Sequence, residues 1–300
     1  MNTDSRTLTL GIPKGSLEES TLGLFARAGF RFYGAERLLW LTSNDPGLKP
    51  VLLRPQEIPH YVANGSLDCG LAGWDWIIEN NCIDQIRVLA DLCYSKRSFC
   101  PVRWVLAVSN DSEVQQVSDL KRLPPPVRIS TELQRVTEGW LAERGISAEV
   151  KFSWGATEAK VPLLADAIVD CTETGSSLQA NGLRVIATVM ESTTRFFANS
   201  LMYKQNDWKR AKLDGIALLL RSSLAAETMD RLHLRVPKSE VDILKALTPS
   251  AASLTVWDGD NGSAVFEIVI DKELSRDLIP VLARNGAQKI SVTSLGMLYG

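Results

Sequence analysis

The segment from residue 166 to residue 178, Asp-Ala-Ile-Val-Asp-Cys-Thr-Glu-Thr-Gly-Ser-Ser-Leu, holds the side chains best suited to chemistry. Carboxylates flank a short apolar strand, and a Thr-Gly-Ser-Ser loop follows before a predicted helix. Backbone amides at a helix N-terminus carry partial positive charge and lack partners within the helix, so they can bind an anion. Gly175 would let the backbone approach a phosphate, and Asp166 and Asp170 could accept hydrogen bonds from sugar hydroxyls. The alternative is that the serines only cap the helix and that Asp170 is solvated.

Basic residues and glycines stand at the predicted ends of several other strands. They are Lys14 and Gly15 in the loop Gly11-Ile-Pro-Lys-Gly-Ser-Leu17, Arg54, Asp68 and Gly73 in Asp68-Cys-Gly-Leu-Ala-Gly-Trp-Asp75, and Arg103. Ligands of open α/β sheets bind outside the carboxyl ends of the strands, so these residues could line one cleft that faces the Thr-Gly-Ser-Ser loop. The first loop is not a Walker A sequence, because G-x-x-x-x-G-K-S/T is absent. Taken singly, each basic residue could equally be a solvated surface charge.

The sequence is poor in residues that nucleophilic and zinc sites use. It has two histidines, His60 and His233, in different predicted domains, and it has no G-x-S-x-G elbow. The cysteine number is odd, no Cys-x-x-Cys pair occurs, and we predict buried free thiols at Cys69, Cys82, Cys93, Cys100 and Cys171. The chemistry should therefore rest on carboxylates, hydroxyls, amides and basic side chains.

Strands and helices alternate through the first 226 residues, which is typical of an α/β region with a mostly parallel sheet. Strands are predicted at 7–11, 51–54, 68–72, 104–109, 127–130, 148–152, 167–170, 185–190 and 197–202. Helices are predicted at 17–28, 55–65, 74–80, 131–143, 174–180 and 206–226.

The last 70 residues follow a different order, β-α-β-β-α-β, which is the ferredoxin-like arrangement. The strands are predicted at 229–236, 253–257, 264–270 and 289–294, and the helices at 240–247 and 274–285. This segment has no catalytic motif, so it is most simply a sensor or an assembly surface.

Composition narrows the class of protein. A length of 300 residues, with 45% hydrophobic and 23% charged residues, predicts two or three folded domains and argues against disorder. The net charge of −2 argues against nucleic-acid binding. The apolar runs are too short for a membrane span, and the N-terminus lacks the apolar core of a signal peptide. We expect a cytoplasmic protein without membrane or nucleic-acid partners.

Several blocks, in order along nearly the whole chain, carry a family resemblance. They are Gly11-Ile-Pro-Lys-Gly-Ser-Leu17, Leu53-Arg-Pro-Gln-Glu-Ile-Pro59, Gly65-Ser-Leu-Asp-Cys-Gly-Leu-Ala-Gly-Trp-Asp75, Ala165-Asp-Ala-Ile-Val-Asp170, Thr174-Gly-Ser-Ser-Leu178 and Ala180-Asn-Gly-Leu183. Together they resemble the long form of ATP phosphoribosyltransferase, which carries a C-terminal regulatory domain. The block at residues 174–178 is the most specific of them.

The resemblance implies a fold class and its division into parts. It implies an α/β, two-lobed, periplasmic-binding-protein-like catalytic region plus a C-terminal ferredoxin-like (ACT-like) α+β domain. Residues 1–107 and 184–226 would form lobe I, residues 108–183 would form lobe II with the site for phosphoribosyl pyrophosphate (PRPP), and residues 228–300 would form the regulatory domain.

The resemblance also implies a reaction, the first step of histidine biosynthesis. The 5-phosphoribosyl group of PRPP would pass to N1 of ATP, and pyrophosphate would leave with Mg²⁺, whose ligands are not implied. The implied catalytic residues are Asp166 and Asp170, and the implied PRPP-binding residues are Asp170, Thr174, Gly175, Ser176, Ser177 and Leu178. The implied ATP- and pyrophosphate-binding residues are Lys14, Gly15, Arg54, Asp68, Gly73, Arg103 and Glu158. Histidine would be an allosteric inhibitor, and the chain would form a homo-oligomer, from dimer to hexamer.

Some positions depart from the family pattern and leave two alternatives open. Val102-Arg-Trp104 replaces the usual Cys-Arg-Leu, and Glu132-Leu-Gln134 follows Thr131 where an aromatic residue and proline are usual. The alternatives are a catalytically weak relative that acts as a regulatory subunit, and a small-molecule binding module. The intact loop at residues 174–178 favours the enzyme over both.

Overall fold

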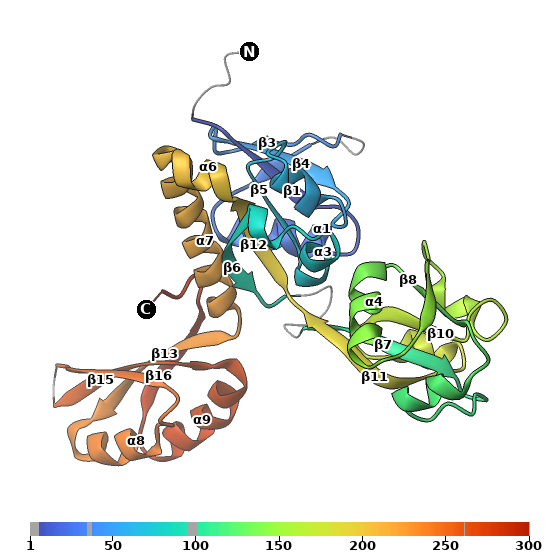
Figure 1. Cartoon of the computed structure of the whole chain (residues 1–300). Coiled ribbons are helices and arrows are strands. Elements are labelled where there is room, and N and C mark those ends of the chain that lie inside the picture. The colour runs from blue at the N-terminus through green and yellow to red at the C-terminus, as the bar shows by residue number, and fades with distance from the viewer. Residues whose placement is uncertain (1–5, 35–37, 95–100, 261, 300) are drawn as a thin grey trace. The chain divides into compact units, whose positions relative to one another are not determined.

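The computed structural model describes residues 6–34, 38–94, 101–260 and 262–299 (Figure 1). The strands are β1 Leu8–Pro13, β2 Phe32–Tyr33, β3 Thr42–Ser43, β4 Leu48–Leu53, β5 Cys69–Gly73, β6 Ile86–Leu92, β7 Val102–Ser109, β8 Val127–Thr131, β9 Ala148–Phe152, β10 Ala167–Thr172, β11 Leu183–Ser192, β12 Thr194–Asn199, β13 Met229–Pro237, β14 Ser253–Asp258, β15 Ser263–Asp271 and β16 Gln288–Ser294. The α-helices are α1 Glu18–Arg27, α2 Ile58–Ala63, α3 Trp74–Glu79, α4 Gln134–Glu143, α5 Ser176–Ala180, α6 Ser200–Gln205, α7 Asp207–Glu227, α8 Val241–Leu247 and α9 Lys272–Arg284. Short 3₁₀ turns lie at Ile83–Gln85, Val117–Arg122, Thr157–Lys160 and Lys238–Glu240.

The chain divides into two compact units. One unit contains Met1–Gly23 and Phe30–Ala217, and the other contains Leu24–Gly29 and Leu218–Gly300. The first unit holds two five-stranded sheets, and the second holds one four-stranded sheet. The lobe and domain boundaries expected from the sequence stay a prediction.

The first sheet of the larger unit has the strand order β4-β1-β5-β12-β6. β1 runs parallel to β4 and β5, and β12 runs antiparallel to β5 and β6. β1 and β5 are buried along nearly their whole length, as expected for central strands that are covered on both faces. A Cβ at Gly70 would lie 2.4 Å from Ile58 Cγ2, so only glycine allows α2 to pack this closely on β5.

The second sheet of this unit has the strand order β11-β7-β10-β8-β9. β8 runs parallel to β9 and β10, whereas β7 runs antiparallel to β10 and β11. Leu106, Ile129 and Val169 pack in its core with Trp140 and Leu141 of α4. A single residue, Thr193, separates β11 of this sheet from β12 of the first sheet. Two sheets joined in this way match the two-lobed α/β class that was expected.

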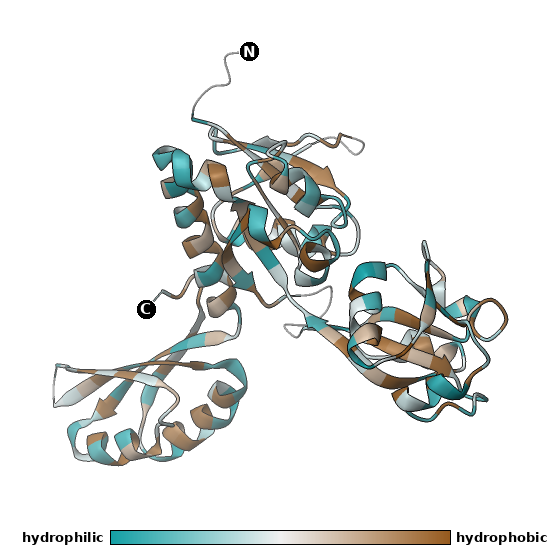
Figure 2. Cartoon of the chain, viewed as in Figure 1, coloured by the Kyte–Doolittle hydropathy of each residue, from teal (hydrophilic) through white to brown (hydrophobic). Residues whose placement is uncertain are grey.

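The smaller unit has the predicted β-α-β-β-α-β order, β13-α8-β14-β15-α9-β16. Its sheet order is β14-β15-β13-β16, and every neighbouring pair is antiparallel, which is the ferredoxin-like topology. β15 alternates between buried and half-buried residues, so one face forms the core with Leu244 of α8 and with Leu278 and Leu282 of α9. Figure 2 shows the matching alternation of hydrophobic and hydrophilic residues along these helices. The ferredoxin-like prediction is confirmed.

Some element predictions were wrong at their boundaries. The strand predicted at 197–202 is β12, which ends at Asn199, because the Asn199 side chain accepts from Met202 N at 2.9 Å and caps α6. The helix predicted from Thr131 starts at Gln134, because Thr131 completes β8 and its hydroxyl accepts from Leu133 N at 3.0 Å. β6 was not predicted, because Arg87 and Asp91 interrupt its apolar pattern.

The cysteine prediction holds only in part. Cys69 and Cys82 are buried, but Cys93 is half-buried and Cys171 is exposed, so burial was wrong for these two. Cys100 lies outside the described residues. Among the helices of the described residues, none is both long and apolar enough to cross a membrane.

Candidate active site

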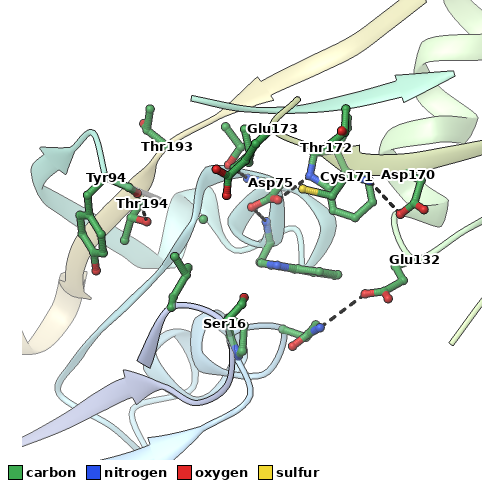
Figure 3. Close-up of a pocket in the computed structure, with 18 residues that line it drawn as sticks. Ser16, Asp75, Tyr94, Glu132, Asp170, Cys171, Thr172, Glu173, Thr193 and Thr194 are labelled. Carbon is green, nitrogen blue, oxygen red and sulfur yellow. Dashed lines mark hydrogen bonds between the residues drawn. The ribbon is translucent and has the colours of Figure 1, made fainter. Parts of the chain in front are cut away.

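A cavity of about 330 Å³ lies where several strands of the larger unit end. β5 ends there at Gly73, β10 ends there at Thr172, and Glu132 directly follows β8. Figure 3 shows the carboxylates of Asp75, Glu132, Asp170 and Glu173 around this region, together with side chains that carry hydroxyl groups. The lining residues are Ser16, Leu17, Pro55, Gln56, Gly73, Asp75, Trp76, Tyr94, Val102, Trp104, Glu132, Asp170, Cys171, Thr172, Glu173, Ser192, Thr193 and Thr194. We call this cavity the carboxylate pocket.

A second cavity, of about 460 Å³, adjoins the first. The two share Gln56, Trp76 and Glu132, so a bound molecule could extend from one into the other. Its remaining lining residues are Arg54, Glu57, Glu79, Asn80, Gln134, Phe152 and Trp154. We call this cavity the aromatic pocket.

Asp170 lies in the carboxylate pocket, as its predicted role requires. Its Oδ1 accepts a hydrogen bond from Cys171 N at 2.8 Å. The pKa of this carboxyl group is raised to about 6, mainly by burial and also by the negative charges of Glu158 and Glu132, while the hydrogen bond from the Cys171 amide acts in the opposite direction. Asp170 is therefore a desolvated carboxylate without a cationic partner in the described part of the chain.

Asp75 is a second buried carboxylate of this pocket, and it was not among the predicted site residues. Trp104 Nε1 donates to its Oδ2 at 2.5 Å, and Trp76 N donates to its Oδ1 at 2.9 Å. Burial raises the pKa of Asp75, and these two hydrogen bonds act against that rise. A Cβ at Gly73 would lie 2.0 Å from Asp75 Oδ1, so the predicted residue Gly73 makes room for this carboxylate.

The predicted phosphate loop directly follows Glu173 of the carboxylate pocket. Gly175 has a left-handed backbone, with φ of 82°, and it precedes α5. Its own amide donates to Thr172 Oγ1 at 2.7 Å. The first bond within α5 runs from Gln179 N to the Gly175 carbonyl, so the Ser177 and Leu178 amides precede the helical ladder. The Thr174 and Ser176 hydroxyls are 3.0 Å apart.

Glu158 lies beside this loop rather than with the predicted ATP-side residues. Ser177 Oγ donates to Glu158 Oε1 at 2.6 Å. A carboxylate at this position would repel a phosphate on the same hydroxyl.

Two predicted carboxylates, Asp68 and Asp166, do not line either cavity. Each directly precedes its strand, whereas the cavities lie at the strand ends. Asp166 accepts from Arg128 Nη2 at 2.7 Å, and the bond from this guanidinium lowers the pKa of Asp166. Four residues of strand span about 13 Å, which separates the backbone of Asp166 from that of Asp170.

The predicted basic residues are divided among different surroundings. Arg54 lines the aromatic pocket, and a Cβ at Gly15 would lie 3.8 Å from its Nη1. Lys14 is exposed and Arg103 is half-buried, and neither lines either cavity.

For the other lining residues, the sequence contains only a weak signal. Glu132 was predicted to lie in a helix, whereas it directly follows β8 in the structure. Tyr94, whose hydroxyl is 2.7 Å from Thr21 Oγ1, and Thr193 lie at the crossings between the sheets, which no local pattern marks. In the described part of the chain, no group of three or more His, Cys, Asp or Glu side chains could hold a metal ion.

Comparisons with known proteins show the family of the chain. The sequence model of the family described as ATP phosphoribosyltransferase matches residues 54–222. The chain belongs to the ATP phosphoribosyltransferase family. Its predicted enzyme class, a pentosyltransferase, is thereby confirmed, and membership places it in histidine biosynthesis.

Curated relatives match over almost their full length. The ATP phosphoribosyltransferase of Pelotomaculum thermopropionicum is 48% identical over 284 residues, which is 94% of this chain and 96% of that protein. That of Chlorobaculum parvum is 45% identical over 291 residues, 97% of each chain. A chain of the ATP phosphoribosyl transferase (HisG:HisZ) complex from Thermotoga maritima aligns with 72% of this chain and 99% of its own length, with a TM-score of 0.59 and 23% identity. This last likeness shows a shared fold.

Proposed function

We propose that the chain transfers the 5-phosphoribosyl group of PRPP to N1 of ATP and releases pyrophosphate, which gives N1-(5-phosphoribosyl)-ATP. The observation that carries the proposal is that the loop at residues 174–178 directly follows Glu173, which lines the carboxylate pocket. A phosphate on the loop would hold the attached ribose next to Asp170.

The 5-phosphate of PRPP suits this loop. The Ser177 and Leu178 amides and the hydroxyls of Thr174 and Ser176 supply hydrogen-bond donors, and Gly175 adds no side chain between them and the ligand. The phosphate would take the Ser177 hydroxyl from Glu158, because a carboxylate and a phosphate cannot share it without repulsion. Glu158 would then be free to face the nucleotide.

The nucleotide and pyrophosphate would lie on the other side of Asp170. Arg54 in the aromatic pocket offers a guanidinium to phosphate oxygens, and Gly15 lies next to it. Lys14 and Arg103 remain candidates for the same anions. We assign Asp68 and Asp166 to holding Lys209 and Arg128 instead of substrate, since their oxygens already accept from these cations.

The transfer requires no nucleophile from the protein. The N1 lone pair of adenine forms a bond to the anomeric carbon of PRPP, and the bond from that carbon to the pyrophosphate oxygen breaks with both electrons leaving on pyrophosphate. Positive charge develops on the ribose in such a transition state, so the Asp170 carboxylate would stabilise it. Orientation of two large anions in one cavity supplies the rest.

Mg²⁺ fits these residues as a metal shared with the substrate. Asp170, Glu132 and Glu173 line the pocket, and Mg²⁺ in proteins is commonly bound by one or two carboxylates together with substrate phosphates. When bound, the ion would neutralise charge on the departing pyrophosphate. These carboxylates would orient it on the pocket side.

The deciding assay follows pyrophosphate release from PRPP with ATP present. We expect release that depends on both substrates. ATP binding without release would favour the regulatory-subunit alternative, and binding of neither substrate would favour a binding module for another ligand.

We further propose that histidine inhibits the enzyme through the smaller unit and that the chain assembles from dimer to hexamer. The ferredoxin-like unit contributes no residue to either cavity, which supports a regulatory or assembly role. A chain that ends at Ala226 should lose inhibition by histidine. A flat PRPP-dependent rate up to millimolar histidine in the full chain would contradict the inhibition, and light scattering of the same sample measures the assembly.

A further inference from the structure

The side-chain carbonyl of Gln56 is buried and has no hydrogen-bond partner in the described part of the chain. Gln56 lines both cavities, so its side chain lies at the junction of the carboxylate pocket and the aromatic pocket. A buried acceptor without a partner costs free energy, and one at the wall of a substrate cavity suggests that a ligand supplies the missing donor.

The surroundings fix which way this amide faces. Gln56 Nε2 donates to Glu132 Oε2 at 3.4 Å, the bond drawn from Glu132 in Figure 3. With the amide turned round, two acceptor oxygens would face each other at that distance, so the observed orientation is the favourable one. The backbone is held as well, because Asn80 Nδ2 donates to the Gln56 carbonyl oxygen at 2.9 Å and to the Trp76 carbonyl oxygen at 2.8 Å.

The cavity beyond this amide has the chemistry of a purine site. Trp76, Phe152 and Trp154 line it, and the rings of the last two lie 5.6 Å apart at 72°. Trp154 is 85% exposed and Phe152 is 49% exposed, so large aromatic faces are open to a stacking partner. Arg54 in the same cavity offers a positive charge for the phosphates of a nucleotide.

We propose that the aromatic pocket binds the purine ring of ATP and that Gln56 Oε1 accepts a hydrogen bond from its 6-amino group. Adenine presents a donor at position 6, whereas guanine presents a carbonyl oxygen, which would face the Gln56 oxygen as a second acceptor. Gln56 is thus the residue that selects adenine over guanine. The inference rests on the proposed function, since it takes ATP as the nucleotide.

The same bond would assist the transfer. The 6-amino nitrogen is conjugated with N1, so an acceptor on its N–H increases electron density at N1, the atom proposed to form the new bond. Gln56 would therefore be both a specificity-determining and a positioning residue. Its loss should affect the affinity for the 6-amino group and the turnover separately.

The test compares ATP with purine riboside 5′-triphosphate, which lacks only the 6-amino group. Equilibrium affinities measured by calorimetry avoid the lower intrinsic reactivity of the analogue. The wild-type protein should bind ATP about ten-fold more tightly, the fold-change expected for one hydrogen bond to a buried acceptor. Gln56→Met keeps the length of the side chain and removes the carbonyl, so it should bind the two nucleotides within about two-fold of each other. The difference in affinity between ATP and GTP should also be smaller in this variant than in the wild type.

Gln134→Met is the matched control, because Gln134 lines the same cavity but uses its amide on the Val150 carbonyl at 3.3 Å. This variant should keep the ten-fold difference. Circular dichroism and the affinity for PRPP check that both variants are folded. If Gln56→Met fails to fold, the wild-type comparison still decides, since equal affinities for ATP and the analogue overturn the proposal.

Two further outcomes also overturn it. One is a ten-fold difference that persists in Gln56→Met, and the other is a difference that disappears in Gln134→Met instead. Failure of the proposed function is distinguishable, because pyrophosphate release would then be absent from the wild-type enzyme with ATP, whatever the affinities are.

Discussion

The two ends of β5 and β10 use aspartate in opposite ways. At the start of these strands, Asp68 and Asp166 have the same set of partners although they lie in different sheets. Each backbone amide donates to a residue of the parallel neighbouring strand, Thr9 or Arg128, and each carboxylate accepts from the amide of that same residue. Each also accepts from a cation, Lys209 Nζ at 2.6 Å for Asp68 and Arg128 Nη2 at 2.7 Å for Asp166.

Near the other ends, the carboxylates have no cationic partner among the residues that the structure describes. Asp170 and Asp75 are desolvated, and burial raises the pKa of both. A carboxylate with a cation and an amide stabilises the strand that it precedes, whereas one that is desolvated costs stability and can interact with a cationic transition state. This difference supports the proposal that the starts of these strands serve the fold and that their other ends serve the chemistry.

The largest expected effect follows from the loop after β10. Gly175→Val should weaken PRPP binding at least about 100-fold, because the side chain displaces the phosphate from amides that contribute about 1.5–3 kcal/mol each. Gly182→Val is the control, since Gly182 also has a positive φ, 69°, and open space for a Cβ, but lies at the other end of α5. Calorimetry with PRPP should show near-normal affinity in the control. Equal losses in both variants would mean that backbone strain, and not the phosphate, explains the result.

Turnover should distinguish Asp166, which precedes β10, from Asp170, which lies within it. Asp170→Asn should lower kcat about 100-fold, because the amide removes the negative charge that faces the ribose, while the affinity for ATP changes less than about three-fold. Asp166→Asn should keep kcat within about three-fold, because its carboxylate faces Arg128. Pyrophosphate release at saturating substrates measures both. A larger loss in Asp166→Asn would return the catalytic role to that residue.

In contrast to turnover, the free energy of unfolding should fall when the aspartates that precede β5 and β10 are substituted. Asp68→Asn leaves Lys209, whose side chain is only 18% exposed, without its partner and should lower the free energy of unfolding by about 2–3 kcal/mol. Asp166→Asn should cost about 1–2 kcal/mol, because Arg128 is 38% exposed and water can solvate it. Because the pKa of Asp166 is lowered, its contribution is present at neutral pH and is lost as the pH falls through that pKa. Urea unfolding at pH 7.5 gives both values, and equal costs would contradict the role of burial.

The last expected effect is a gain in stability. The pKa of Asp170 is raised to about 6, so between about pH 4 and pH 6 the folded chain binds more protons than the unfolded chain, and stability falls as the pH rises through this range. Asp170→Asn removes this cost and should raise the free energy of unfolding at pH 7.5, on the order of 1–3 kcal/mol before screening by water. The gain should fall to about half at pH 5. A variant that is less stable than the wild type at pH 7.5 would show that Asp170 supports the fold.

Part of the site could be predicted because residues with charged or hydroxyl side chains stand at the ends of predicted strands in the sequence. The order of strands and helices predicts the α/β class, and the alternation in residues 229–294 predicts the ferredoxin-like unit, since one buried face requires a period of two. Gly175 and the hydroxyl groups around it predict a loop whose backbone amides a phosphate can approach. Family blocks named the reaction class, which no periodicity could supply.

Only the tertiary structure decided which carboxylates have a cationic partner and which line a cavity. Asp68, Asp166 and Asp170 all flank predicted strands, and the sequence does not show that Lys209, 141 residues away, already binds the first of them. The hydrogen bond of Gln56 likewise cannot be predicted from the sequence, because its partner is Glu132, 76 residues further along the chain. The periodicity of hydrophobic residues predicts which face of a strand or helix is buried. The pKa and the hydrogen-bond partners of a side chain depend instead on groups that folding brings together from distant segments.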